Sequence, residues 1–118
     1  MDEHNIQKVL VAWFRQTYPS MSNLFFAIPN GGARDLVTAK RLKEEGVLAG
    51  VPDLFLAVPR HGYPGLWLEL KTEAGVLSSV QKKIQGELSQ QGYAVATAKG
   101  YHSAKSVLIG YLDAIIRE

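Results

Sequence analysis

Three ionisable residues lie within two apolar segments, and their types suit metal-dependent chemistry. Asp53 begins the segment Asp53–Val58, whose other residues are uncharged. Glu69 and Lys71 stand in the segment Leu66–Lys71, whose remaining residues are Leu and Trp. A buried carboxylate or ammonium is costly unless it is paired or bound to a metal. If the segments pair as strands, two carboxylates and a lysine meet at one end of a sheet. The sequence therefore predicts a hard-cation site beside a proton-handling group.

The strand pattern supports this pairing. In a strand, alternate residues point to opposite faces, so Trp67, Glu69 and Lys71 share one face and the leucines between them share the other. The linking segment 59–65 reads Pro-Arg-His-Gly-Tyr-Pro-Gly, which is typical of turns. We therefore expect Asp53–Val58 and Leu66–Lys71 to form an antiparallel hairpin.

Hydrophobic periodicity and capping residues predict the other elements. These are a helix from Asp2 to about Tyr18, a strand at Leu24–Ile28, a helix over about Ala33–Glu45 capped by Gly46, a helix with a Ser78/Gln81 capping box ending near Gly92, a strand at Tyr93–Ala98 and a helix from about Ser103. The order is α-β-α-β-β-α-β-α. The helix before Tyr93 has the length of a right-handed crossover, which makes the last strand parallel to the Glu69 strand. The predicted fold is α/β, a mixed β-sheet flanked by helices.

The apolar faces of three helices are predicted from their spacing. The first helix is expected to bury Ile6, Val9, Leu10, Trp13 and Phe14; the third to line one side with Val80, Ile84 and Leu88; and the last to bury Val107, Leu108, Tyr111, Leu112 and Ile115.

Length and composition set further limits. With 118 residues, 47% of them hydrophobic and 20% charged, we expect a single folded domain over residues 1–118. The net charge of +2 permits a nucleic-acid partner without implying one. The absence of cysteine excludes disulfides, thiolate zinc sites and cysteine nucleophiles, and fits the cytoplasm. We expect no signal peptide, no membrane association and no P-loop, hence no nucleotide cofactor.

Taken together and in this order, Pro52-Asp53 and Glu69-Leu70-Lys71 resemble the catalytic motif of the PD-(D/E)XK (restriction-endonuclease-like) nuclease core. The remaining motifs are similar to the VRR-NUC family, especially its small stand-alone members from phages and bacteria. They are Glu3 and Gln7 on the first helix, the loop 29–34 (Pro-Asn-Gly-Gly-Ala-Arg), the approach 46–53 to the aspartate, and 77–81 with its glutamine. The resemblance extends from Glu3 to about Tyr111.

The resemblance implies a DNA endonuclease that depends on Mg²⁺ or Mn²⁺ and hydrolyses phosphodiester bonds. It implies that Asp53, Glu69 and the backbone carbonyl of Leu70 bind the metal, and that Glu3 reaches the metal or its water shell. A favourable charge in the first helical turn is the alternative for Glu3. Lys71 is expected to orient or deprotonate water, or to neutralise charge in the transition state; a salt bridge to Glu69 alone is its alternative.

Other polar residues have two interpretations each. Gln81 either orients Lys71 or contacts DNA, or it serves only the capping box. Asn30, Gly31, Gly32 and Arg34 form a loop at the start of a helix, where N–H groups and a guanidinium suit a DNA phosphate; a solvated arginine is the alternative. Lys40, Arg41 and Lys43 are typical of a solvated face, or extend this basic surface.

Known relatives imply branched DNA, such as a four-way (Holliday) junction, as the substrate. A homodimer is expected because resolving a junction needs two cuts, and because three segments carry much apolar surface. These segments are the first helix with Trp13 and Phe14, the strand Leu24–Ile28 and the last helix. The family's small members also imply the cytoplasm of a bacterial or phage-infected cell. Two alternatives stay open: a non-catalytic nucleic-acid-binding module on the same fold, and a nuclease for duplex ends or RNA.

Overall fold

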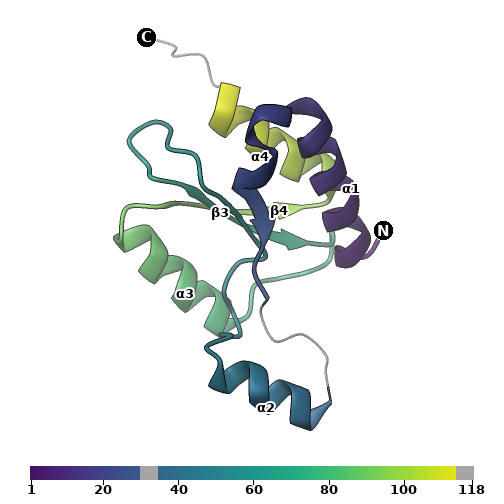
Figure 1. Ribbon diagram of the computed structural model, residues 1–118, viewed down its shortest axis with the longest axis vertical. Coiled ribbons are helices and arrows are strands. Elements are labelled where there is room, and N and C mark those ends of the chain that lie inside the picture. The colour runs from purple at the N-terminus through teal and green to yellow at the C-terminus, as the bar shows by residue number, and fades with distance from the viewer. Residues whose placement is uncertain (30–34, 114–118) are drawn as a thin grey trace.

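A four-stranded sheet carries the Asp53 and Glu69 segments at its centre (Figure 1). The computed structural model describes residues 1–29 and 35–113. The strands lie in the order β1 (Phe25–Ala27), β2 (Leu54–Leu56), β3 (Leu66–Lys71) and β4 (Ala94–Lys99). β1 and β2 are antiparallel, β2 and β3 form the predicted antiparallel hairpin, and β3 and β4 are parallel. The predicted mixed sheet is therefore confirmed.

The described α-helices are α1 (Glu3–Thr17), α2 (Leu36–Glu44), α3 (Ser79–Gln90) and α4 (Tyr101–Asp113), of which α1, α3 and α4 flank the sheet. The predicted caps form as expected, because short polar side chains satisfy the free N–H groups of a first turn. Asp2 accepts a hydrogen bond from the Asn5 N–H at 2.8 Å, and Ser78 and Gln81 form a complete capping box. Gly46 follows α2 with a φ of 101°, the left-handed conformation that favours glycine at a helix end.

The structure corrects several predicted boundaries, among them that of β2, which covers Leu54–Leu56 rather than the whole of Asp53–Val58. A 3₁₀ helix, η1 (Pro19–Leu24), follows α1, so Leu24 belongs to a helix and β1 is shorter than predicted. In the described residues α2 begins at Leu36, where the Asp35 carboxylate accepts from the Thr38 N–H at 2.8 Å. α4 begins at Tyr101 rather than near Ser103, because Gly100, with a φ of 88°, turns the chain directly from β4 into the helix.

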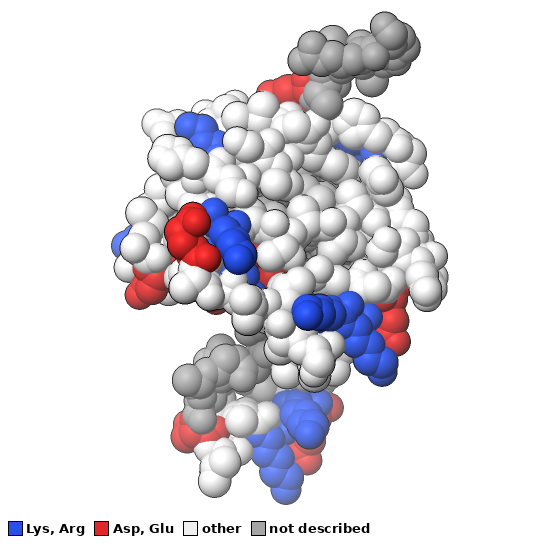
Figure 2. Space-filling view, turned by 180° about the vertical axis from the view of Figure 1, so that it is seen from behind, with Lys and Arg blue, Asp and Glu red and all other residues white. Residues whose placement is uncertain are grey.

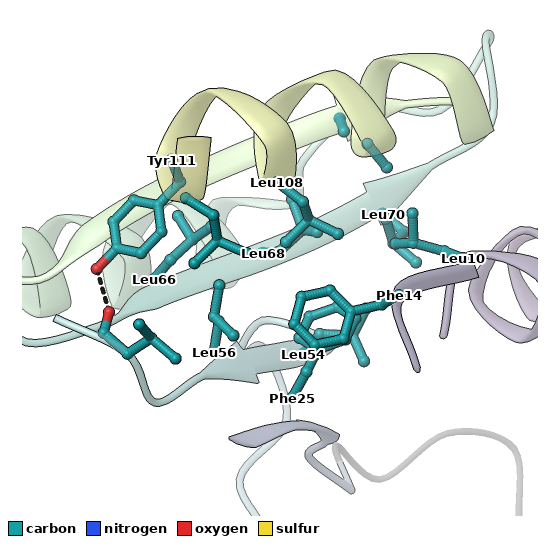
Figure 3. Packing of buried hydrophobic residues seen from close by; sticks show 14 of the residues in the cluster. Leu10, Phe14, Phe25, Leu54, Leu56, Leu66, Leu68, Leu70, Leu108 and Tyr111 are labelled. Atoms are coloured by element: carbon teal, nitrogen blue, oxygen red, sulfur yellow. Dashed lines mark hydrogen bonds between the residues drawn. The ribbon is translucent and has the colours of Figure 1, made fainter. Parts of the chain in front are cut away.

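The core lies between α1, α4 and one face of the sheet (Figure 3). Phe14 of α1 packs against Phe25 of β1, with ring centroids 4.5 Å apart. At the other end of the core, the Tyr111 hydroxyl of α4 donates to the Val58 carbonyl at 2.6 Å and ties the helix to the chain after β2. The buried side chains include Ile6, Leu10, Leu54, Leu56, Leu66, Leu68, Leu70 and Leu108.

The predicted apolar faces are only partly buried. Val9 is 40% exposed because α1 turns Ile6, Leu10 and Phe14 toward the sheet. Val80 is 52% exposed, and Ile84 and Leu88 are half-buried. On α4, Leu108, Tyr111 and Leu112 are buried and Val107 is half-buried, whereas Ile115 lies outside the described residues.

The opposite face of the sheet holds Phe55, Trp67 and Glu69 and is approached by α3. Phe55 and Trp67 are register partners in β2 and β3, and their rings pack with centroids 4.4 Å apart and planes tilted by 38°. Gly50, with a φ of 96°, lies so close to α3 that a Cβ there would be 2.6 Å from Val80 Cγ1. Glycine at this position therefore lets the chain before Asp53 pack directly on α3.

α2 projects from the rest of the molecule (Figure 1). Its side chains include Leu36, 89% exposed, and Val37, 69% exposed. Within residues 1–29 and 35–113, no helix is both long enough and apolar enough to cross a membrane.

Candidate functional site

The hairpin register brings Asp53 to the end of β3. Leu54 pairs with Leu68, so one further step places Asp53 beside Glu69. Asp53 Oδ2 accepts a hydrogen bond from the Leu70 N–H at 2.7 Å. On the other edge of β3, the Lys71 carbonyl accepts from the Gly100 N–H at 2.9 Å. Since successive residues of a strand direct their backbone groups to opposite edges, the Leu70 groups face the β2 edge. The Asp53 carboxylate thus takes a position that a strand backbone would otherwise fill.

Pro52 explains why the Leu70 carbonyl suits a metal. Continued for two residues, the register of Leu54 with Leu68 would set Pro52 opposite Leu70. Proline has no backbone N–H, so this position offers the Leu70 carbonyl no donor. The carbonyl faces the same edge as the Asp53 carboxylate. The role of Leu70 as a metal ligand stays a prediction, and this arrangement gives it a physical reason.

Glu69 is buried, 1% exposed, and its two carboxylate oxygens differ in their surroundings. Oε2 accepts from Gln81 Nε2 at 3.1 Å and lies 3.6 Å from Lys71 Nζ. Oε1 is buried and has no hydrogen-bond partner among the described residues. A buried oxygen without a partner is unfavourable by about 1–3 kcal/mol. The arrangement leaves Oε1 as the oxygen that a cation can take.

Gln81 links this carboxylate to the start of α3. Its Oε1 accepts from the Ser78 N–H at 2.9 Å, and its own N–H donates to Ser78 Oγ at 3.1 Å. The capping box thereby fixes which end of the amide points away from the helix, and that end, Nε2, donates to Glu69. Gln81 therefore serves the capping box, as one interpretation predicted, and also donates to Glu69, a contact that neither interpretation named. Its predicted action on Lys71 or on DNA stays a prediction.

The electrostatics of the pair favour a cation. Burial and the nearby Asp53 carboxylate raise the pKa of Glu69 to about 7, although Lys71 and its hydrogen bond act in the opposite direction. One lysine therefore does not balance two carboxylates in this setting. Oxygen ligands of this kind suit Mg²⁺ or Mn²⁺, which also retain several waters. The donor set of Asp53, Glu69 and the Leu70 carbonyl fits such an ion.

Other predicted site residues are not brought to this cluster. Glu3 is exposed in the first turn of α1, and the described residues contain no group of three or more His, Cys, Asp or Glu that could hold a metal. The metal role of Glu3 thus stays a prediction without support from this geometry. Gln7 lines a separate hollow beside β1. Asn30, Gly31, Gly32 and Arg34 lie outside the described residues, so their DNA contacts also stay predictions.

Sequence reasoning missed Lys82 and Lys99, which lie close to Lys71. Lys99 is the register partner of Lys71 in β4, and Lys82 stands in the first turns of α3. All three line one hollow at this end of the sheet. The parallel pairing of the last strand was predicted and contained a signal for Lys99, but the predicted strand ended one residue earlier, at Ala98.

Comparison with known protein families and solved structures gives one family match and a similar structure. The family model described as the VRR-NUC domain matches residues 1–102. A solved structure described as a VRR-NUC domain protein is 26% identical, covers 96% of this chain and 89% of its own, and has a TM-score of 0.83. No curated protein sequence matches. The structural match confirms the predicted fold class, and the matched residues contain the whole Asp53, Glu69, Lys71 and Gln81 cluster.

The raised pKa of Glu69 predicts how the stability of the metal-free protein depends on pH. A carboxyl group with a folded-state pKa near 7 and an ordinary value of 4.5 stabilises the fold below about pH 4.5. This contribution is lost as the pH rises through 7, and amounts to at most about 3 kcal/mol. Glu69→Gln, which retains the shape of the side chain, should remove this dependence. Thermal melts in EDTA should show the variant gaining stability over the wild type between pH 5 and pH 8. If the melting temperatures of the wild type and Glu69→Gln changed equally with pH, this account of Glu69 would be contradicted.

Proposed function

Because this chain belongs to the VRR-NUC family of nuclease domains, we propose that it is a metal-dependent DNA endonuclease with Asp53, Glu69 and Lys71 in its active site. The observation that carries the proposal is the buried, unpartnered Oε1 of Glu69 beside a second carboxylate that raises the pKa of Glu69. Two neighbouring buried carboxylates do not stabilise the fold by themselves, whereas metal-dependent phosphodiester hydrolysis needs a cation held by such groups. We further propose that residues 1–118 form one nuclease domain.

Each residue has a distinct role in this proposal. Asp53, Glu69 and the Leu70 carbonyl hold the cation, which when bound activates water and offsets charge on the phosphoryl oxygens. Lys71 is 8% exposed and lies 3.6 Å from Glu69 Oε2, so it presents a positive charge at the edge of the cluster. Its stem packs closely on the turn after β3, where a Cβ on Gly75 would lie 3.3 Å from both Lys71 Cβ and Cδ. This packing restricts the ammonium group to the place where the reacting phosphate is expected.

We propose branched DNA, including the four-way junction, as the substrate. The described elements form one sheet with its flanking helices. Shape and backbone charge are therefore the features that this fold reads most directly. α2 carries the basic side chains Lys40, Arg41 and Lys43, and blue side chains appear beside red ones at the projecting end in Figure 2. In a branched DNA, the projecting α2 could contact a second duplex arm beside the arm that is cut.

We also propose that the working unit is a homodimer, because a symmetric pair presents two sites to one junction. The structure changes the apolar argument for it. Phe14 and Phe25 are buried in the core and Trp13 packs against it, so the exposed apolar side chains that remain on these segments include Val9, Leu24, Phe26 and Ile109, each 39–40% exposed. The exposed apolar side chains of α2 and the following turn support the dimer better; they are Leu36 (89%), Val37 (69%) and Leu48 (56%).

Cleavage should depend on the three residues of the proposed active site. Asp53→Asn, Glu69→Gln and Lys71→Ala should each lower the rate of cleavage by at least about a hundredfold, because the first two weaken binding of the cation and the third removes the positive charge beside the reacting phosphate. Binding should survive, since phosphate contacts supply most of the affinity. The measurement is single-turnover cleavage of four-way junction, flap, duplex and single-stranded DNA with Mg²⁺ or Mn²⁺. The junction should be cut fastest. Full activity in excess EDTA, or rapid cutting by Lys71→Ala, would contradict the proposal.

Gln81 should act as a positioning residue through Glu69. Gln81→Glu can keep the acceptor of the capping box but loses the donor to Glu69, so kcat should fall by at least about tenfold. Ser78→Ala is the matched control, because it weakens the same cap while leaving Gln81 Nε2 in place. It should destabilise the protein by about 1 kcal/mol and change kcat by less than about threefold. If the two variants lowered kcat equally, Gln81 would serve the helix alone.

The dimer predicts a definite mass in solution. Sedimentation equilibrium at micromolar protein should give twice the chain mass, and Leu36→Glu should shift it toward the monomer because a charge would enter an apolar contact. Val9→Glu on α1, which likewise places a charge at an exposed apolar residue, serves as the control and should remain dimeric. A monomer mass for the wild type, with and without junction DNA, would remove the dimer and the paired-cut scheme together.

A further inference from the structure

A hollow of about 540 Å³ opens beside Lys71 at the ends of β3 and β4. Its charged lining consists of three lysines, Lys71, Lys82 and Lys99. Thr97 and Ser103 add hydroxyl groups, and Gly75, Val76 and Leu77 also line the hollow. Among the residues that the structure describes, the lining includes no Asp or Glu. Lysines from a strand end, the neighbouring strand end and a helix thus surround one space without a carboxylate among them.

Two of these three lysines have no carboxylate partner among the described residues, whereas Lys71 lies 3.6 Å from Glu69 Oε2. Lys82 and Lys99 form no ion pair in the part of the chain that the structure describes. Lys83, the residue next to Lys82, differs: it lies 3.9 Å from Glu87 on the exposed side of α3. The adjoining hollow, which Lys99 also lines, contains Glu73. The positive charge of Lys82 and Lys99 is therefore available to an anion that enters the first hollow.

Lys71 connects this hollow to the proposed active site. Its ammonium group lies 3.6 Å from Glu69 Oε2 on one side, and the residue lines the hollow on the other. The backbone register fixes Lys99 next to Lys71 in the sheet, and Gln85 of α3 donates to Thr97 Oγ1 at 3.1 Å, which ties α3 to the same strand. The hollow is thus built from paired elements and lies directly beside the metal-binding cluster.

We propose that Lys82 and Lys99 bind a backbone phosphate of the DNA strand next to the phosphate that is cut. This inference rests on the proposed nuclease function and assigns its substrate a path, from the Asp53 and Glu69 cluster across Lys71 into the lysine-lined hollow. A DNA strand carries one charge at every linkage, so a strand with one phosphate at the cluster necessarily presents another nearby. Lysine suits such a contact as a flexible point charge.

The test measures binding in a background that does not cut. Asp53→Asn protein, without divalent cations, is titrated with labelled junction and duplex DNA at several salt concentrations. Adding Lys82→Gln or Lys99→Gln should weaken binding to both by about fivefold to tenfold at 0.1 M salt and reduce the salt slope by about one. Lys83→Gln is the matched control, equal in charge and adjacent in sequence, and should change affinity by less than about twofold. Lys99→Arg should restore binding.

The outcomes separate this inference from the proposed catalysis. If Lys82→Gln and Lys99→Gln behave like Lys83→Gln, the hollow does not bind DNA, whatever the active-site variants do. If both weaken binding while Asp53→Asn protein still cuts, the phosphate site stands and the active site is wrong.

A second experiment places the phosphate on the strand. In active protein, a neutral methylphosphonate linkage beside the cut should slow the wild type by at least about fivefold and leave the Lys82→Gln/Lys99→Gln variant unaffected. Equal slowing of both proteins would overturn the assignment.

Discussion

The approach of two carboxylates in a buried setting is the constraint on which the site depends. Asp53 and Glu69 come together because an antiparallel hairpin pairs Leu54 with Leu68 and the next residues follow that register. Burial and the repulsion from Asp53 raise the pKa of Glu69 to about 7, and the Lys71 ammonium does not offset them. The protein keeps this unfavourable pair at the end of a sheet whose other face is filled with leucine and phenylalanine. A divalent cation is the simplest partner that relieves it.

Several features of the fold serve this pair. Pro52 leaves the Leu70 carbonyl without a strand donor, and the Asp53 carboxylate takes the Leu70 N–H instead. The capping box of α3 holds Gln81 so that its amide donates to one oxygen of Glu69. Gly50 allows the chain before Asp53 to lie against α3, the helix that carries Gln81. The start of α3, the chain before Asp53 and the end of β3 therefore together position Glu69, and a change in any of them should alter the surroundings of its carboxylate.

Sequence reasoning reached the sheet, the hairpin and the capping box because each has a local signal: alternation, turn residues and a polar cap followed by glutamine. It also placed Asp53, Glu69 and Lys71 together, since they follow from the register. It did not predict the hydrogen bond from Gln81 to Glu69. These residues are twelve positions apart in the sequence, and they meet only because α3 packs on β3. The lysine-lined hollow and the projection of α2 were missed for the same reason. Lys71, Lys82 and Lys99 come from three elements, and their meeting depends on tertiary packing.

The most direct test of the central claim is a calorimetric titration of the metal-free protein with Mn²⁺ in the absence of DNA. The account predicts saturable binding by the wild type and by Ser78→Ala. It predicts at least about tenfold weaker binding by Asp53→Asn and by Glu69→Gln, because each variant leaves only one carboxylate for the cation. Equal Mn²⁺ affinity in the wild type and both carboxylate variants would show that the pair is not a metal site.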